Sequence, residues 1–155
     1  MSDTGVNPVG TVDPLETAPS FAGLEVGDVV ASREVLVSRD TLVRYAGASG
    51  DFNPIHYNDA FAQSVGLPGV IAHGMLTMGL AASVVEEWAG AGNVADFQAR
   101  FTRPIAVPNP GAATVTITAT VGALDAELQT ARIDLAVEFE GAKVLGKAQA
   151  IVACS

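Results

Sequence analysis

Hydrophobic residues alternate with polar or small ones along much of the last third of the chain. The alternation is clearest in two runs: Val115, Ile117, Ala119 and Val121, and then Ile133, Leu135, Val137 and Phe139. A period of two residues is typical of strands that bury one face, as in antiparallel sheets. Further strands are predicted at 27–37, 96–103 and 144–152, with a hairpin turn at Glu140 and Gly141. We therefore expect a largely antiparallel sheet.

Residues 74–88 are the one long apolar helix that the pattern predicts. Their hydrophobic side chains surround the helix axis on nearly all sides, and such a helix is usually buried. Shorter helices are predicted after Ser38, which can cap a helix ending at Gly47 or Gly50, and after Asn58. One buried helix with an antiparallel sheet wrapped around it predicts the α+β class.

Composition narrows the class of protein. The chain has 155 residues, 49% of them hydrophobic, which suits a single domain with a real core. It carries 8 basic and 17 acidic residues, a net charge of −9, which argues against binding to nucleic acid or to an anionic membrane surface. Residues 60–85 contain no charged side chain, but Gln63, Pro68 and His73 interrupt them, so a loop and a buried helix fit better than a membrane span.

The first 20 residues differ from the rest of the chain. They hold five glycines and prolines, three acidic residues and no basic ones, so we expect a flexible tail over 1–20 and a single folded domain over 21–155. The tail has no apolar stretch of the kind found in signal peptides. Cys154 is the single cysteine, which excludes an internal disulfide framework. Together these features predict a cytoplasmic protein.

The candidate chemistry lies in the loop from Tyr45 to His56. Asp51 and His56 are five residues apart across a turn that Asn53 and Pro54 make rigid. A carboxylate and an imidazole held together can give and take protons near neutral pH. From spacing alone an alternative stays open, in which Asp51 caps a helix and His56 only bonds to the main chain.

This loop resembles the hydratase-2 motif of the MaoC-like dehydratases. The matching positions are Tyr45, Ser49, Gly50, Asp51, Asn53, Pro54, Ile55, His56 and Ala62. Residues 69–75 resemble the start of that family's central helix, and 101–104 resemble a later strand. The resemblance covers roughly residues 24–153. It implies a hot-dog fold, in which an antiparallel sheet wraps a long helix and two subunits usually join their sheets.

The resemblance also implies roles for individual residues. Asp51 and His56 would be the catalytic dyad for reversible syn addition of water to trans-2-enoyl thioesters, giving (3R)-hydroxyacyl thioesters. The main-chain N–H of Gly74, at the N-terminus of the central helix, would stabilise negative charge on the thioester oxygen. The carrier would be coenzyme A (CoA) or the phosphopantetheine of acyl carrier protein (ACP), and no other cofactor is expected.

The similarity is greatest to the catalytic B-type subunit of heterodimeric (3R)-hydroxyacyl-ACP dehydratases of actinobacteria. A homodimer and a heterodimer with a related hot-dog subunit therefore both stay open. Two other functions remain as alternatives: a hot-dog acyl thioesterase and a non-enzymatic acyl-binding subunit. The spacing of Asp51, Asn53 and His56 disfavours the first, and the presence of both dyad residues disfavours the second.

The sequence also singles out residues outside the dyad. Ser49 and Asn53 are expected to organise the loop, and His73 to bond to the main chain. Met75 is either part of an acyl tunnel or ordinary core. Arg100, Arg103 and Arg132 either bind carrier phosphates or form salt bridges, and if they are scattered a basic partner chain becomes the better source of positive charge. Two histidines without ligand-type spacing predict no metal site.

Overall fold

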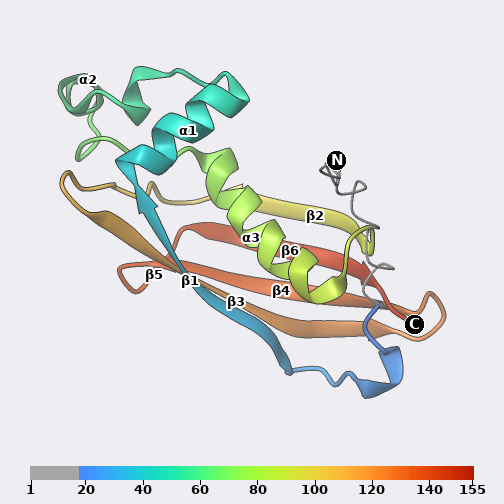
Figure 1. Cartoon of the computed structure of the whole chain (residues 1–155). Helices are drawn as coiled ribbons and strands as arrows, with labels where there is room; N and C mark the ends of the chain where they lie inside the picture. Colours follow the sequence, from blue (N-terminus) through green and yellow to red (C-terminus); the bar gives the residue numbers. More distant parts are fainter. Residues whose placement is uncertain (1–17) are drawn as a thin grey trace, which may run out of the picture.

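The computed structural model describes residues 18–155 and contains a six-stranded, wholly antiparallel sheet (Figure 1). The order is β1-β3-β4-β6-β2, and the short β5 pairs with β4. The strands are β1 (Val29–Ser38), β2 (Val94–Phe101), β3 (Ala112–Asp125), β4 (Thr130–Phe139), β5 (Ala142–Lys143) and β6 (Leu145–Ala153). The predicted turn is confirmed, since Glu140 and Gly141 adopt φ values of 51° and 72° between the paired Phe139 and Ala142.

Three α-helices and two short 3₁₀ helices accompany the sheet. They are η1 (Phe21–Gly23), α1 (Arg39–Ser49), η2 (Pro54–His56), α2 (Asp59–Ser64) and α3 (Gly74–Ala89). The predicted caps are confirmed: the Ser38 hydroxyl accepts from the Thr41 N–H, and the Asn58 side chain accepts from the Phe61 N–H. Gly50 ends α1 in the left-handed conformation, with φ of 76°.

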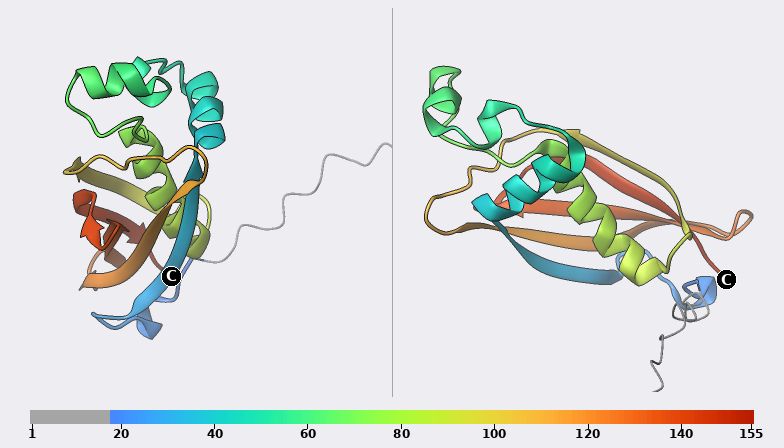
Figure 2. Two further views of the ribbon diagram at one scale, coloured as in Figure 1. Left: turned by 90° about the vertical axis from the view of Figure 1, so that its left-hand side faces the viewer. Right: turned by 45° about the horizontal axis from the view of Figure 1, so that its top comes forward.

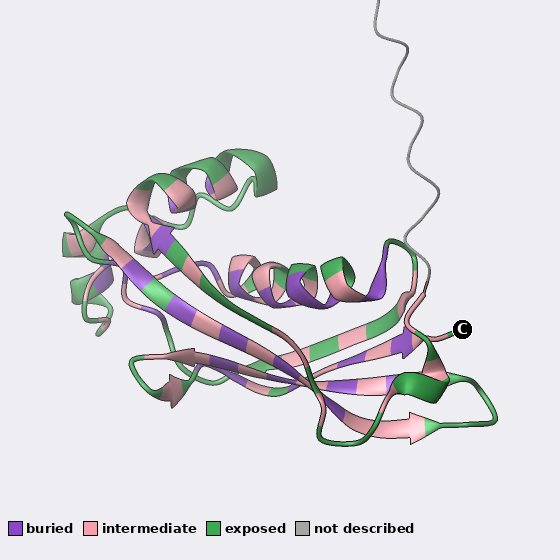
Figure 3. Ribbon diagram, turned by 60° about the horizontal axis from the view of Figure 1, so that its bottom comes forward, coloured by how far each residue is buried: buried purple, intermediate pink, exposed green. Residues whose placement is uncertain are grey.

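Helix α3 lies across one face of the curved sheet, which is the expected hot-dog architecture (Figures 1 and 2). Its buried residues include Ala81, Val84 and Val85, which join Ile117 and Ile133 of the sheet in one core (Figure 3). The prediction that α3 is buried on all sides is wrong. Met75 is 59% exposed, because the sheet covers only one side of the helix in this chain.

The two ends of the described chain meet beside β6. The Phe21 N–H donates to the Ser155 carbonyl, and the Ser155 N–H donates to the Pro19 carbonyl. Residues 1–17 of the expected tail lie outside the described residues, so the boundary at 20 stays a prediction. None of the helices within residues 18–155 has the length and apolar character needed to cross a membrane.

Candidate active site

The loop between α1 and η2 is built from three consecutive side-chain turns. The Asp51 N–H donates to the Ser49 hydroxyl, the Asn53 N–H to Asp51 Oδ1, and the Ile55 N–H to Asn53 Oδ1, each at 3.2 Å. In each turn a side-chain oxygen bonds the main chain two residues onward. Ser49 and Asn53 thus hold the loop in place, and Asp51 uses one carboxylate oxygen for the loop while Oδ2 remains available.

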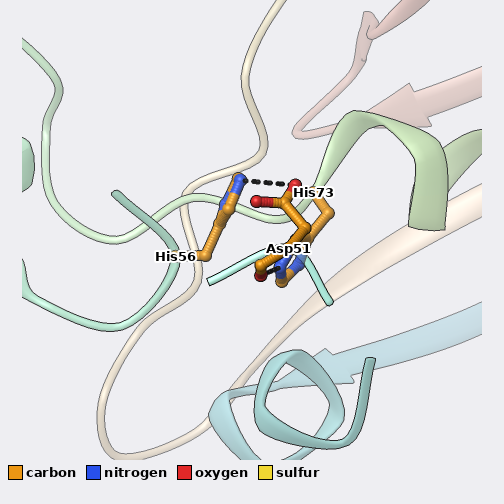
Figure 4. Close-up of side chains that lie close together, drawn as sticks. All are labelled: Asp51, His56 and His73. Carbon is orange, nitrogen blue, oxygen red and sulfur yellow. Dashed lines mark hydrogen bonds and ion pairs between the residues drawn. The ribbon is translucent and has the colours of Figure 1, made fainter. Parts of the chain in front are cut away.

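Asp51 and His56 face each other across a short gap (Figure 4). The distance from Asp51 Oδ2 to His56 Nε2 is 3.8 Å, with the imidazole buried and the carboxylate half exposed. His56 Nδ1 lies 2.8 Å from the Ile71 carbonyl oxygen, which can only accept a hydrogen bond. Nδ1 therefore carries the proton in the neutral ring, and the lone pair of Nε2 points to the gap.

The gap has the size of a bridging water. It is too long for a direct hydrogen bond, but a water about 2.8 Å from both atoms would be bound at an angle of about 86°. Such a water would donate one proton to the carboxylate and one to the imidazole. The pair is therefore arranged to hold and deprotonate a water molecule.

His73 lies directly behind His56. The two rings stack with centroids 3.7 Å apart and planes 24° apart, and the Tyr45 ring packs against His73 in a T-shaped arrangement with centroids 4.8 Å apart. His73 Nε2 lies 3.1 Å from the Asp51 carbonyl oxygen, so the predicted main-chain bond is confirmed. Burial lowers the pKa of His73, the hydrogen bond to Asp51 partly offsets this, and His56 lowers it further. The stack itself was not predicted, because a separation of 17 residues leaves no signal in the sequence.

Asp51, His56 and His73 also place one ligand-type atom each within 4.8 Å of one another. However, lone pairs of imidazole lie in the ring plane, and two nearly parallel rings direct them side by side rather than at one ion. One nitrogen of each ring is already engaged with a carbonyl oxygen. This arrangement suits proton transfer better than metal binding.

His56 opens onto a cavity of about 420 Å³ at the N-terminus of α3. Its lining is mostly apolar and also includes Ile55, Ile71, Ala72, Gly74, Thr77, Phe101, Thr102, Arg103, Pro104, Ile105, Val144 and Leu145. No side chain caps α3, so the Gly74 N–H at its first turn has no partner within the helix. A Cβ at Gly74 would lie 3.1 Å from the Phe101 ring, so glycine is what allows this close packing. The cavity thus combines an imidazole with the positive end of a helix.

Comparison with known proteins identifies the family. A family model described as MaoC like domain matches residues 22–137. The chain belongs to the MaoC-like family. The (R)-specific enoyl-CoA hydratase of Rhodospirillum rubrum is 34% identical over 93 residues, which are 59% of this chain and 65% of that protein.

Two further relatives support the same assignment. The 3-hydroxyacyl-thioester dehydratase X of Mycobacterium tuberculosis is 40% identical over 65 residues, which are 42% of this chain and 22% of that protein. A solved MaoC-like dehydratase superposes with a TM-score of 0.86 at 37% identity, covering 89% of this chain and 43% of the other. The matches therefore cover less than two thirds of each relative's own length.

The remaining candidate residues of this MaoC-like chain differ in whether they line the cavity. Arg103 lines the cavity, whereas Arg100 and Met75 are not among its lining residues. Arg132 forms an ion pair with Asp134, so the salt-bridge interpretation holds for it. Of the three arginines, Arg103 alone therefore lines the cavity. Phe101, as a cavity residue, was missed because alternation predicts a strand without fixing which side chains meet the helix.

Proposed function

We propose that this chain catalyses reversible syn hydration of trans-2-enoyl thioesters to (3R)-hydroxyacyl thioesters. The observation that carries the proposal is the 3.8 Å gap between Asp51 Oδ2 and His56 Nε2, beside a cavity that His56 shares with the start of α3. The names of the relatives, an (R)-specific enoyl-CoA hydratase and a 3-hydroxyacyl-thioester dehydratase, support it.

The reaction follows from the dyad. A water held by the Asp51 carboxylate and the His56 lone pair loses one proton to the dyad as its oxygen bonds to C3 of the enoyl group. The electron pair of the double bond shifts toward the thioester, and the dyad returns one proton to C2 on the same face. The product gains one water, as OH on C3 and H on C2, and no electrons are exchanged. The reaction therefore needs no redox cofactor.

The main-chain N–H of Gly74 is the third group in the proposed reaction, after Asp51 and His56. Negative charge develops on the thioester oxygen as the C3–O bond forms. An unpaired N–H at a helix N-terminus, on a wall of the same cavity, stabilises such charge. The substrate carbonyl would therefore lie against the first turn of α3.

The carrier is expected to bear phosphate, as CoA and ACP phosphopantetheine both do. Within residues 18–155 four of the basic side chains form ion pairs: Arg33, Arg39, Arg44 and Arg132. Arg103 and Lys143 form none, and the Thr102 hydroxyl donates to the Lys143 carbonyl next to the cavity. These two cations are the best candidates to bind the phosphate at the cavity mouth.

An assay of the purified chain with crotonyl-CoA tests the function, following loss of the conjugated enoyl absorbance and identifying the product as the (3R) acid. Release of free thiol without hydration would instead favour the thioesterase alternative. Arg103→Ala should raise KM for crotonyl-CoA by about tenfold, as expected for loss of a charge-assisted hydrogen bond, but leave crotonyl-pantetheine, which lacks phosphate, unchanged. Arg44→Ala, which removes a cation from the exposed face of α1, is the matched control.

We propose that two copies of the chain form a homodimer through the outer edge of β2. The sheet ends at β2, which leaves main-chain groups on that edge unpaired within the described chain. Asp96 and Arg100 are exposed and stand symmetrically about Gln98. In an antiparallel pairing of two copies centred on Gln98, each Asp96 would face the partner's Arg100.

Charge reversal tests this pairing. Cross-strand ion pairs contribute about 0.2–1 kcal/mol each, and like charges cost a similar amount. Arg100→Glu should weaken the dimer, and the double change Asp96→Arg with Arg100→Glu should restore it, both measured by sedimentation equilibrium. Failure of the double change to restore the dimer would contradict this register. A wild-type chain that stays monomeric would favour a non-identical hot-dog partner.

A further inference from the structure

His73 contacts both members of the dyad at once. Its Nε2 bonds the main-chain carbonyl of Asp51, and its ring stacks on the His56 ring at 3.7 Å. Only 1% of its surface is exposed. The Tyr45 ring of α1 also packs against it, so Asp51, His56 and Tyr45 are the titratable residues in contact with His73.

We infer that His73 is a positioning residue for the dyad, because one imidazole fixes the main chain that carries Asp51 and supports the ring plane of His56. This inference rests on the proposed function for its effect on rate, but its geometry can be tested without activity. His73 is the N-cap of α3 and precedes Gly74. The same residue therefore connects the dyad to the proposed oxyanion donor.

The hydrogen-bond pattern fixes the form of His73. A carbonyl oxygen can only accept, so Nε2 carries the proton. His73 Nδ1 is then a lone pair, and it is buried without a partner among the described residues. A second proton there would place a positive charge against the ring of His56 without a hydrogen-bond acceptor. His73 therefore stays a neutral imidazole, which stacks on His56 and donates one hydrogen bond from Nε2. It takes no proton during the reaction.

Two substitutions separate the two contacts. His73→Gln keeps an N–H at about the reach of Nε2 but removes the ring, whereas His73→Phe keeps a ring but leaves the Asp51 carbonyl without its donor. We expect kcat to fall about tenfold in His73→Phe and about threefold in His73→Gln, with KM within twofold in both. Val84→Ala, a buried change on α3 ten residues after Gly74, controls for lost stability.

A rate within twofold of the wild type for His73→Phe would overturn the inference. A loss of the same size in Val84→Ala would show that stability alone explains the effect.

A second readout does not depend on turnover. The chain has only two histidines, so long-range ¹H–¹⁵N spectra contain two imidazoles. We expect His73 to keep its proton on Nε2, with Nδ1 unprotonated, between pH about 6 and 8. The amide signal of Phe52, which shares a peptide group with the Asp51 carbonyl, should shift in His73→Phe and much less in His73→Gln. A proton on Nδ1 would overturn the inference even in an active enzyme, and an inactive wild type with the expected spectra would contradict only the proposed function.

Discussion

The Asp51→Asn substitution tests the dyad with little disturbance of the loop. The Asp51 Oδ1 atom accepts a hydrogen bond from the Asn53 N–H, and the amide oxygen of asparagine can accept the same bond. The negative charge beside His56 Nε2 is lost. We therefore expect an unchanged fold with a changed reaction rate.

The size of the loss distinguishes two roles for Asp51. If the carboxylate only stabilised a positive His56, its worth at 3.8 Å would be about 1 kcal/mol in a water-like environment, which corresponds to about a fivefold rate change. We use the Coulomb energy for a water-like environment because the Asp51 carboxylate is half exposed. If Asp51 itself transfers a proton, the loss should be about 10²- to 10⁴-fold. We expect the larger loss.

The assay is hydration of crotonyl-CoA under saturating and limiting substrate, with the unfolding temperature measured in parallel. Asp40→Asn is the matched control, since it removes one carboxylate from the exposed surface of α1. A loss of fivefold or less in Asp51→Asn, with an unchanged unfolding temperature, would refute a proton-transfer role for Asp51.

Three further predictions concern the surroundings of the dyad. Gly74→Ala should lower kcat about tenfold in the same assay, because the new Cβ meets the Phe101 ring at 3.1 Å and moves the start of α3. Burial keeps the pKa of His73 lower in the folded than in the unfolded protein, so stability should be constant above pH about 6.5 and fall below it, by up to about 1.4 kcal/mol per pH unit. Thermal unfolding from pH 5 to 8 should show a shallower fall in His73→Gln. Asn53→Ala should lower both kcat and the unfolding temperature, whereas Asn53→Asp should retain more of each, since only the latter keeps the acceptor for the Ile55 N–H.

Local signals in the sequence were sufficient for most elements of the fold. Ser38, Gly50 and Asn58 act within a few residues of their own position, so the helix ends could be placed from sequence. Alternation likewise located β3 and β4. The prediction that α3 is buried on all sides was wrong because the hydrophobic pattern does not tell how many sides of a helix the rest of the chain can cover.

In the candidate site, too, some residues could be predicted from the sequence and others could not. Asp51 and His56 lie in one short loop, and the resemblance pointed to both. Arg100 and Arg103 looked alike in sequence, but only Arg103 lies where the strand has ended and the chain turns along the cavity. The stack of His56 on His73 depends on how the loop packs against the start of α3, and only the tertiary structure shows it.

The C-terminus lies at the far end of α3 from the dyad, because Ala153 bonds to Asn93, just beyond the last turn of that helix (Figure 1). Helix α3 has 16 residues and is therefore about 24 Å long. A carrier protein fused to the C-terminus would need a flexible linker of about 20 residues for its mean extension to match that distance. Effective concentration is highest near that match and falls with longer linkers. A linker series would therefore turn the length of one helix into a measurable optimum in turnover.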